Sequence, residues 1–142
     1  MKDSKGFTLI ELVVTIALVG ILLGTAIPTF HRVVAETQSQ VNISNMEIIK
    51  DTFLQYYYDN HMGSDPHFPQ VPSDSLLNAT YRQTTLGDGR TPDMLFSGEL
   101  PYNSNKKPFS YYWDDDSTTK RIVVRDNDLD SPSYNEIVIG EI

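Results

Sequence analysis

The feature that most constrains this chain is an uncharged apolar run close to its N-terminus. From Leu12 to Phe30 the sequence holds no charged residue, and roughly 20 such residues form a helix that spans a bilayer. One carboxylate, Glu11, lies at the start of this run. An ionised group inside lipid costs about 3 kcal/mol or more unless it finds a partner. We therefore predict a membrane-spanning helix in which Glu11 is a functional residue with a cationic partner.

A short leader precedes the run, and its small residue lies before the apolar stretch. An ordinary secretory signal is cleaved after its apolar stretch, which is then lost. Here cleavage between Gly6 and Phe7 would retain the helix and create a charged amine on Phe7. That amine would lie one helical turn from Glu11, or it would face Glu11 of a neighbouring subunit. A plain N-terminal membrane anchor is the alternative interpretation.

The residues around this bond carry a resemblance to a known family. The string from Lys5 to Glu11, KGFTLIE, together with the apolar run behind it, resembles the class III signal of type IV pilins and type II secretion pseudopilins. The resemblance is strong over residues 5–30, fair to Asn60 and only architectural beyond. It implies cleavage after Gly6 by a prepilin peptidase, N-methylation of Phe7 and assembly into a helical filament. In the filament, Glu11 is expected to pair with the Phe7 amine of the adjacent subunit.

The remaining sequence predicts an α+β fold with a long N-terminal helix packed on a small antiparallel sheet, as in the pilin fold. Past the apolar run, apolar residues recur at helical spacing: Phe30, Val34, Val41, Met46, Ile49, Phe53 and Tyr57. We expect a leader over 1–6, a transmembrane or filament-core helix over 7–30, an amphipathic helix over 31–60 and a globular head over 61–142. In the head we expect a short helix near 73–78 and strands near 109–113, 118–125 and 134–139.

Three residues interrupt the apolar half of the helix: Gly20, Gly24 and Pro28. Glycine costs about 1 kcal/mol relative to alanine in a helix, and proline about 3 kcal/mol or more. Membrane helices tolerate both, so a simple kink is one interpretation. The family resemblance implies a second one, in which the segment between Gly20 and Pro28 loses helicity on assembly.

Composition excludes several classes of function. The chain has no cysteine, so it has neither a disulfide nor a catalytic or metal-binding thiolate, and its net charge of −8 argues against a broad nucleic-acid surface. It also lacks a glycine-rich phosphate loop, a His-Glu-x-x-His motif and a nucleophile elbow. We therefore expect no enzyme activity: the chain is the substrate of the chemistry at Gly6 and Phe7.

One acidic cluster is a candidate metal site. Asp126, Asp128 and Asp130 alternate along the sequence, and such carboxylates can converge on a hard cation such as Ca²⁺. The cluster is not an EF-hand, because the expected glycine is missing and Ile137 stands where that loop has glutamate. The resemblance to major pseudopilins, which often bind Ca²⁺ in the C-terminal sheet region, supports the site; a solvated acidic turn is the alternative. No other cofactor is expected.

These observations predict a structural filament subunit. The cysteine-free head and the tyrosine-rich helix end favour a type II secretion pseudopilin, and the alternatives are a type IV surface pilus subunit for adhesion or motility, or a minor pilin that binds DNA or a surface ligand. The expected partners are further copies, related minor subunits, the prepilin peptidase, the inner-membrane assembly platform and lipid, with no nucleic acid. We expect a single-pass protein of the cytoplasmic (inner) membrane with its head outside, and later a periplasmic or cell-surface filament.

Overall fold

The computed structural model describes residues 6–63, 65–116 and 118–142. Its contacts divide the chain into two compact units, residues 1–36 and residues 37–142. We refer to the second unit as the head. Most of the predicted leader, residues 1–5, lies outside the described residues.

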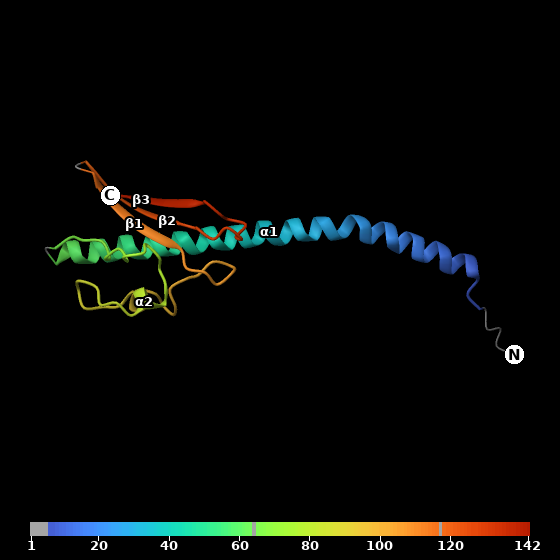
Figure 1. The fold of residues 1–142 in the computed structure, drawn as a ribbon, viewed down its shortest axis with the longest axis horizontal. Coiled ribbons are helices and arrows are strands. Elements are labelled where there is room, and N and C mark those ends of the chain that lie inside the picture. The colour runs from blue at the N-terminus through green and yellow to red at the C-terminus, as the bar shows by residue number, and fades with distance from the viewer. Residues whose placement is uncertain (1–5, 64, 117) are drawn as a thin grey trace. The chain divides into compact units, whose positions relative to one another are not determined.

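One helix, α1, runs from Leu9 to Met62 (Figure 1). The two halves expected over 7–30 and 31–60 lie in this one long helix, which continues through Pro28 and ends two residues beyond the predicted position. At its end the Gly63 N–H donates to the Asn60 carbonyl at 3.0 Å. Helix loss between Gly20 and Pro28 concerns the assembled filament and stays a prediction.

Phe30 and Val34, which precede the head, are exposed. Within the head, the buried face of α1 follows the predicted apolar spacing with one correction. Met46, Ile49 and Phe53 are fully buried, as expected. Val41, however, is 49% exposed, and its neighbour Asn42 is fully buried in its place. The sequence pattern placed the apolar residue inward, but the hydrogen bonds that Asn42 donates to serines of the C-terminal loop, described below, determine which of the two side chains faces the interior.

Three antiparallel strands form the sheet in the order β1-β2-β3. They are β1 (Ser110–Asp116), β2 (Thr119–Arg125) and β3 (Ile137–Glu141). The α+β architecture is therefore confirmed. The third strand begins at Ile137 and not at 134, because the backbone is still turning there: Asn135 has a φ of +67°, and the Glu136 N–H donates to the Ser133 carbonyl at 2.9 Å.

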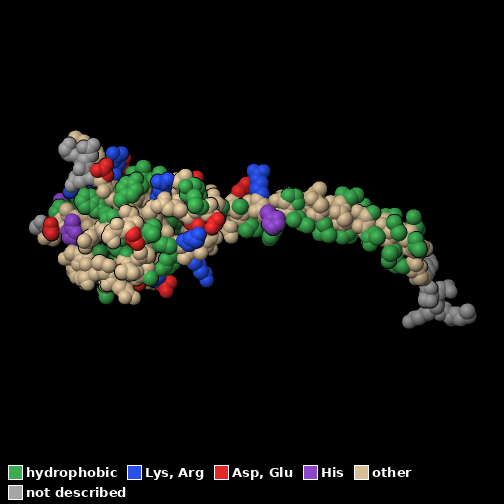
Figure 2. Space-filling model, in the orientation of Figure 1, with side chains coloured by type: hydrophobic (Ala, Val, Ile, Leu, Met, Phe, Trp, Pro, Cys, Tyr) green, Lys and Arg blue, Asp and Glu red, His purple; other side chains and the backbone are tan. Residues whose placement is uncertain are grey.

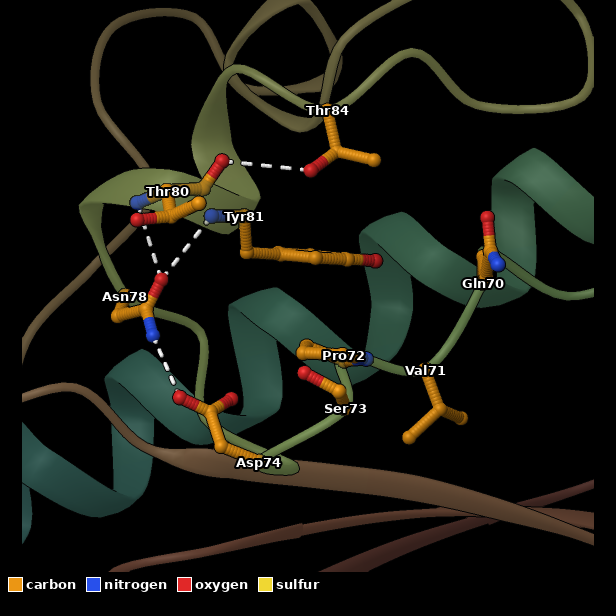
Figure 3. Close-up of a pocket in the computed structure, with 9 residues that line it drawn as sticks. All are labelled: Gln70, Val71, Pro72, Ser73, Asp74, Asn78, Thr80, Tyr81 and Thr84. Atoms are coloured by element: carbon orange, nitrogen blue, oxygen red, sulfur yellow. Dashed lines mark hydrogen bonds between the residues drawn. The ribbon is translucent and has the colours of Figure 1, made fainter.

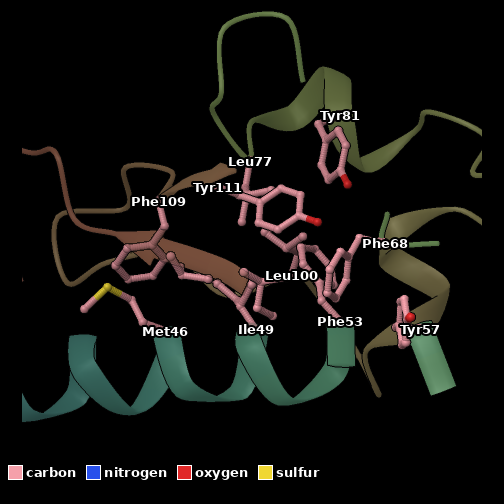
Figure 4. Close-up of a cluster of buried hydrophobic side chains, with 12 residues drawn as sticks. Met46, Ile49, Phe53, Tyr57, Phe68, Leu77, Tyr81, Leu100, Phe109 and Tyr111 are labelled. Carbon is pink, nitrogen blue, oxygen red and sulfur yellow. The ribbon is translucent and has the colours of Figure 1, made fainter. Parts of the chain in front are cut away.

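The core lies between α1 and the inner face of the sheet (Figure 4). The Phe53 ring meets the Tyr111 ring edge-to-face, with centroids 4.7 Å apart. At Gly140 the third strand approaches α1 so closely that an added Cβ would lie 3.0 Å from Leu54 Cδ1 and from Lys50 Cγ. A side chain at this position would require the Leu54 and Lys50 side chains to shift by a few tenths of an ångström.

Two short helices cross the loop-rich middle, α2 (Ala79–Arg82) and α3 (Pro92–Leu95). The helix predicted near 73–78 is wrong, since the described helix begins where that one was expected to end. Ser75 has a φ of +58°, and Leu76 forms an isolated bridge to Ser110. Asn78 is the N-cap of α2, because its side-chain oxygen accepts from the Thr80 and Tyr81 N–H groups.

Candidate functional site

The N-terminus of α1 is closed by a capping box. Thr8 precedes the first helical residue, and its N–H and hydroxyl donate to Glu11 Oε2 at 2.8 and 2.7 Å. In return the Glu11 N–H donates to Thr8 Oγ1 at 3.3 Å. This is the reciprocal pattern of a Thr-x-x-Glu capping box. Sequence analysis missed this role of Glu11, although the spacing alone signals it.

The predicted cleavage bond lies just before this cap. Residues 6–8 are outside any helix, and the Phe7 side chain is 79% exposed. Phe7 and Glu11 line one hollow at the start of α1, together with Ile10, Val14 and Thr15. The structure thus brings together the two residues that sequence analysis selected for assembly. Cleavage at Gly6 and methylation of Phe7 stay predictions.

The apolar part of α1 has no covering layer within the described chain. Between Gly6 and Val41 no described residue is buried, and Figure 2 shows hydrophobic side chains along this stretch. By length and composition, α1 is the one described helix that could cross a membrane. An apolar surface of this extent marks a membrane or protein contact.

The head contains a buried polar network centred on Asn42, which sequence analysis also missed. Its Nδ2 donates to Ser131 Oγ at 3.0 Å and Ser133 Oγ at 2.8 Å, and also to Ser104 Oγ at 3.2 Å. Its Oδ1 accepts from the Ser104 N–H at 2.7 Å. One side chain thereby ties α1 to two loops of the head. A lone asparagine on an apolar helix face is the only sequence signal for it.

Asp126, a predicted calcium ligand, is fully buried at the other end of this network. Its Oδ2 accepts from the hydroxyls of Ser131 at 2.6 Å and Ser133 at 2.7 Å. Its Oδ1 accepts from Asn103 Nδ2 at 3.3 Å and from the Asp128 N–H at 3.0 Å. Hydroxyl and amide donors therefore satisfy this carboxylate within the protein.

The other two predicted ligands contact a lysine. Lys107 Nζ lies 2.6 Å from Asp128 Oδ1 and 3.4 Å from Asp130 Oδ2. The ammonium, and then the Asn105 side chain, hold the pKa of Asp128 well below its usual range. No group of three acidic, histidine or cysteine side chains suited to a metal occurs among the described residues. Calcium binding stays a prediction, and an ion here would have to displace Lys107.

A separate hollow of 290 Å³ lies between residues 70–74 and α2 (Figure 3). Its main polar groups serve the local backbone. Asp74 accepts from the Leu76 N–H at 3.0 Å and from Asn78 Nδ2 at 2.8 Å. The Thr84 hydroxyl donates to the Thr80 carbonyl at 3.3 Å. These contacts explain the turn without a ligand.

Comparisons with known proteins find relatives that share the N-terminal sequence pattern of this chain. Residues 1–27 match the family model of the prokaryotic N-terminal methylation motif. A fimbrial protein of Pseudomonas aeruginosa is 33% identical over 89 residues, which cover 63% of this chain and 56% of that protein. The type IV major fimbrial protein FimA of Dichelobacter nodosus (strain VCS1703A) is 33% identical over 104 residues, 72% of this chain and 62% of that protein. The type IV major pilin protein PilE of Neisseria gonorrhoeae is 44% identical over 79 residues, 55% and 47% respectively.

The chain spans about half to three-fifths of the length of these curated relatives, and no solved structure matches it. The methylation motif lies on the capped, exposed start of α1. The helix behind it packs on a three-stranded antiparallel sheet. These features and relatives together support membership of the type IV pilin family for this chain.

Proposed function

We propose that this chain is the subunit of a type IV filament, and more specifically of a surface type IV pilus. The observation that carries the proposal is the uncovered apolar half of α1, headed by one carboxylate. Burying apolar surface contributes roughly 25 cal/mol per Å², so such a helix needs either lipid or other copies of itself around it. Lipid would surround the precursor, and neighbouring helices would surround the assembled subunit.

In this proposal the leader is removed after Gly6 by a prepilin peptidase, and the new Phe7 amine is methylated. The precursor crosses the inner membrane once with its head outside, and the assembly platform moves it into the growing filament. There the Phe7 amine of one subunit forms an ion pair with the Glu11 carboxylate of its neighbour. The attraction between the two charges mainly offsets the cost of removing them from water, so this contact specifies the register of the subunits more than it adds to stability.

The choice of a surface pilus is supported by the relatives, which are named fimbrial proteins and type IV major pilins. The second candidate is the type II secretion pseudopilus. It is favoured by the absence of cysteine from the chain. Many type IVa pilins share a C-terminal disulfide loop, which this chain cannot form. Neither candidate involves catalysis by the chain itself.

Mass spectrometry of sheared surface material and of the membrane fraction tests both the processing and the destination. We expect abundant chain that begins at N-methyl-Phe7 in the sheared filaments. The same processed chain confined to the envelope would favour the pseudopilus. An uncut leader in cells with an active prepilin peptidase would return the protein to a membrane anchor and refute the proposal.

Two variants at one position test the role of Glu11. Glu11→Val removes both the cap and the charge, so we expect cleavage and membrane insertion but no incorporation beside wild-type subunits. Glu11→Gln keeps an acceptor for the Thr8 N–H but removes the charge, and we expect it to fail in the same way. Val14→Leu, an apolar exchange in the same hollow, is the control and should incorporate. Normal incorporation of Glu11→Gln would show that the cap, and not the ion pair, is what assembly needs.

A further inference from the structure

The acidic loop, residues 126–136, joins β2 to β3 and carries three carboxylates within five residues. Asp126 is fully buried and Asp128 is 7% exposed. Carboxylates at this depth are costly unless hydrogen-bond donors or a cation compensate them. Four hydroxyl and amide donors, described above, compensate Asp126. The charges that still need a cation are therefore those of Asp128 and Asp130.

Lys107 supplies a cation at this place. Its Nζ lies 2.6 Å from Asp128 Oδ1 and 3.4 Å from Asp130 Oδ2. One ammonium thus bridges two carboxylates of the loop, as a bound metal ion does. Arg125, the basic residue at the end of β2, donates to Asn135 instead.

A tight turn over residues 103–107 holds this lysine in position. The Asn103 N–H donates to the Lys107 carbonyl at 3.0 Å, and the Lys107 N–H donates to Asn103 Oδ1 at 2.8 Å. Lys106 lies inside the same turn with a φ of +60° and is exposed. Two adjacent lysines therefore differ in role, because only the second one of the turn contacts the acidic loop.

The groups around the ammonium suit a lysine better than calcium. Asn103 Oδ1 accepts from the Asn105 and Lys107 N–H groups at 3.0 and 2.8 Å, and its Nδ2 therefore points to Asp128 Oδ2 at 3.1 Å. Asn105 Nδ2 also donates to Asp128 Oδ2, at 2.7 Å. Two carboxylate oxygens, Asp128 Oδ1 and Asp130 Oδ2, are left for the cation. They can accept from an ammonium, whereas Ca²⁺ takes about six to eight oxygen ligands.

We propose that the Lys107 ammonium is the built-in cation of the acidic loop and takes the place of the calcium ion that the resemblance to major pseudopilins implies. The stability of the head is then independent of divalent cations. A tethered ammonium needs no ion from the medium, whereas weak calcium sites fill only at about 0.1–1 mM Ca²⁺. The loop is bound to Asn42 of α1 through Ser131 and Ser133, so the ammonium also supports the attachment of this loop to the long helix. The inference holds for either type of filament.

Urea unfolding of the full chain in detergent micelles tests the inference. The midpoint of the wild type should be the same in EDTA and in Ca²⁺. Lys107→Glu replaces the cation by a fourth carboxylate, so its midpoint in EDTA should fall by about 0.5–1 M. Ca²⁺ should recover at least half of this loss, because the new carboxylate adds oxygen ligands beside Asp128 and Asp130. Lys106→Glu is the matched control, since it makes the same change of charge at the neighbouring exposed lysine.

Two further variants separate the charge from the fold. Lys107→Arg keeps the positive charge and should keep both the stability of the wild type and its indifference to Ca²⁺. Lys107→Met removes the charge without adding another, and its midpoint in EDTA should lie between those of the wild type and Lys107→Glu. It also keeps the test available if Lys107→Glu does not fold.

Three results would overturn the inference. The first is a wild-type midpoint that rises with Ca²⁺ but not with Mg²⁺, because the loop would then bind calcium in spite of the lysine. The second is an unchanged midpoint of Lys107→Met in EDTA, because the ammonium would then not stabilise the loop. The third is an equal response of Lys107→Glu and Lys106→Glu to Ca²⁺, because the lysine would then not stand where a cation binds.

Discussion

Replacing Asn42 by leucine should destabilise the head strongly, although it puts an apolar residue on a buried helix face. Asn42 is fully buried, and its side chain makes hydrogen bonds with three serines from two loops of the head. Leucine has about the same length but can neither donate nor accept. The variant therefore separates the effect of lost hydrogen bonds from the effect of lost volume.

The magnitude follows from the groups left without partners. The half-buried Ser104 N–H loses the acceptor that it has at 2.7 Å, and an unpartnered donor costs about 1–3 kcal/mol where water does not replace the partner. Ser131 and Ser133 lose a donor but still donate to Asp126, so each contributes about 0.5–1 kcal/mol. The total is about 3 kcal/mol, less a small gain from the added apolar side chain.

Urea unfolding of the full chain in detergent micelles measures this change, with Trp113 as the reporter because it is the only tryptophan. For a urea slope of about 2 kcal/mol per molar, a loss of about 3 kcal/mol lowers the midpoint by about 1.5 M. Val41→Leu is the control, since the same residue enters the neighbouring, half-exposed position. Surface substitutions of this kind change stability by about 0.5 kcal/mol or less.

A midpoint for Asn42→Leu within about 0.3 M of the wild type would refute this reasoning, since it corresponds to about 0.5 kcal/mol. It would mean that water satisfies the loop groups, and that the network is not what attaches the loops to α1.

Three further changes test other contacts of the head. The Tyr81 hydroxyl is buried without a hydrogen-bond partner among the described residues, whereas the Tyr111 hydroxyl donates to the Pro69 carbonyl at 3.0 Å. Tyr81→Phe should therefore leave the urea midpoint unchanged or higher. Tyr111→Phe should lower the free energy of unfolding by about 1 kcal/mol. Equal losses for both would contradict this. Lys107 lowers the pKa of Asp128, so the ion pair stabilises the fold above the unfolded-state pKa of about 3.9. This stabilisation is lost as the pH falls toward the folded-state pKa. When the pH is lowered below about 4, Asp128→Asn should therefore lose less stability than the wild type does. If Ca²⁺ binds Asp126, Asp128 and Asp130, it should raise the midpoint where Mg²⁺ does not, and more so in Lys107→Met; no change in either protein would refute the site.

The elements with strong periodic patterns were predictable from sequence. The long helix and the three strands follow from apolar spacing. The position of the short helix α2 could not be predicted from sequence, because Asn78 acts as an N-cap only once the chain has turned at Ser75. The exchange of Val41 for Asn42 on the buried face was also hidden, since it depends on serines about 90 residues away.

The two candidate assembly residues could be selected from the sequence, but their local geometry could not be predicted. The leader string and the isolated carboxylate identified Phe7 and Glu11 by pattern. That Glu11 also closes the first turn depends on the side-chain conformation of Thr8. In the acidic loop, no sequence pattern indicated that Lys107, about 20 residues earlier, contacts two of the three aspartates.

The capping box at Thr8 bears on the proposed cleavage between Gly6 and Phe7. Every hydrogen bond of the box lies on the C-terminal side of the Gly6–Phe7 bond, so removal of the leader takes away none of them. If cleavage occurs as proposed, the precursor and the mature chain can begin their helix at the same residue, and proteolysis needs no refolding of α1. The proposed cleavage would then change the charge at the end of the helix and leave the helix itself as it was.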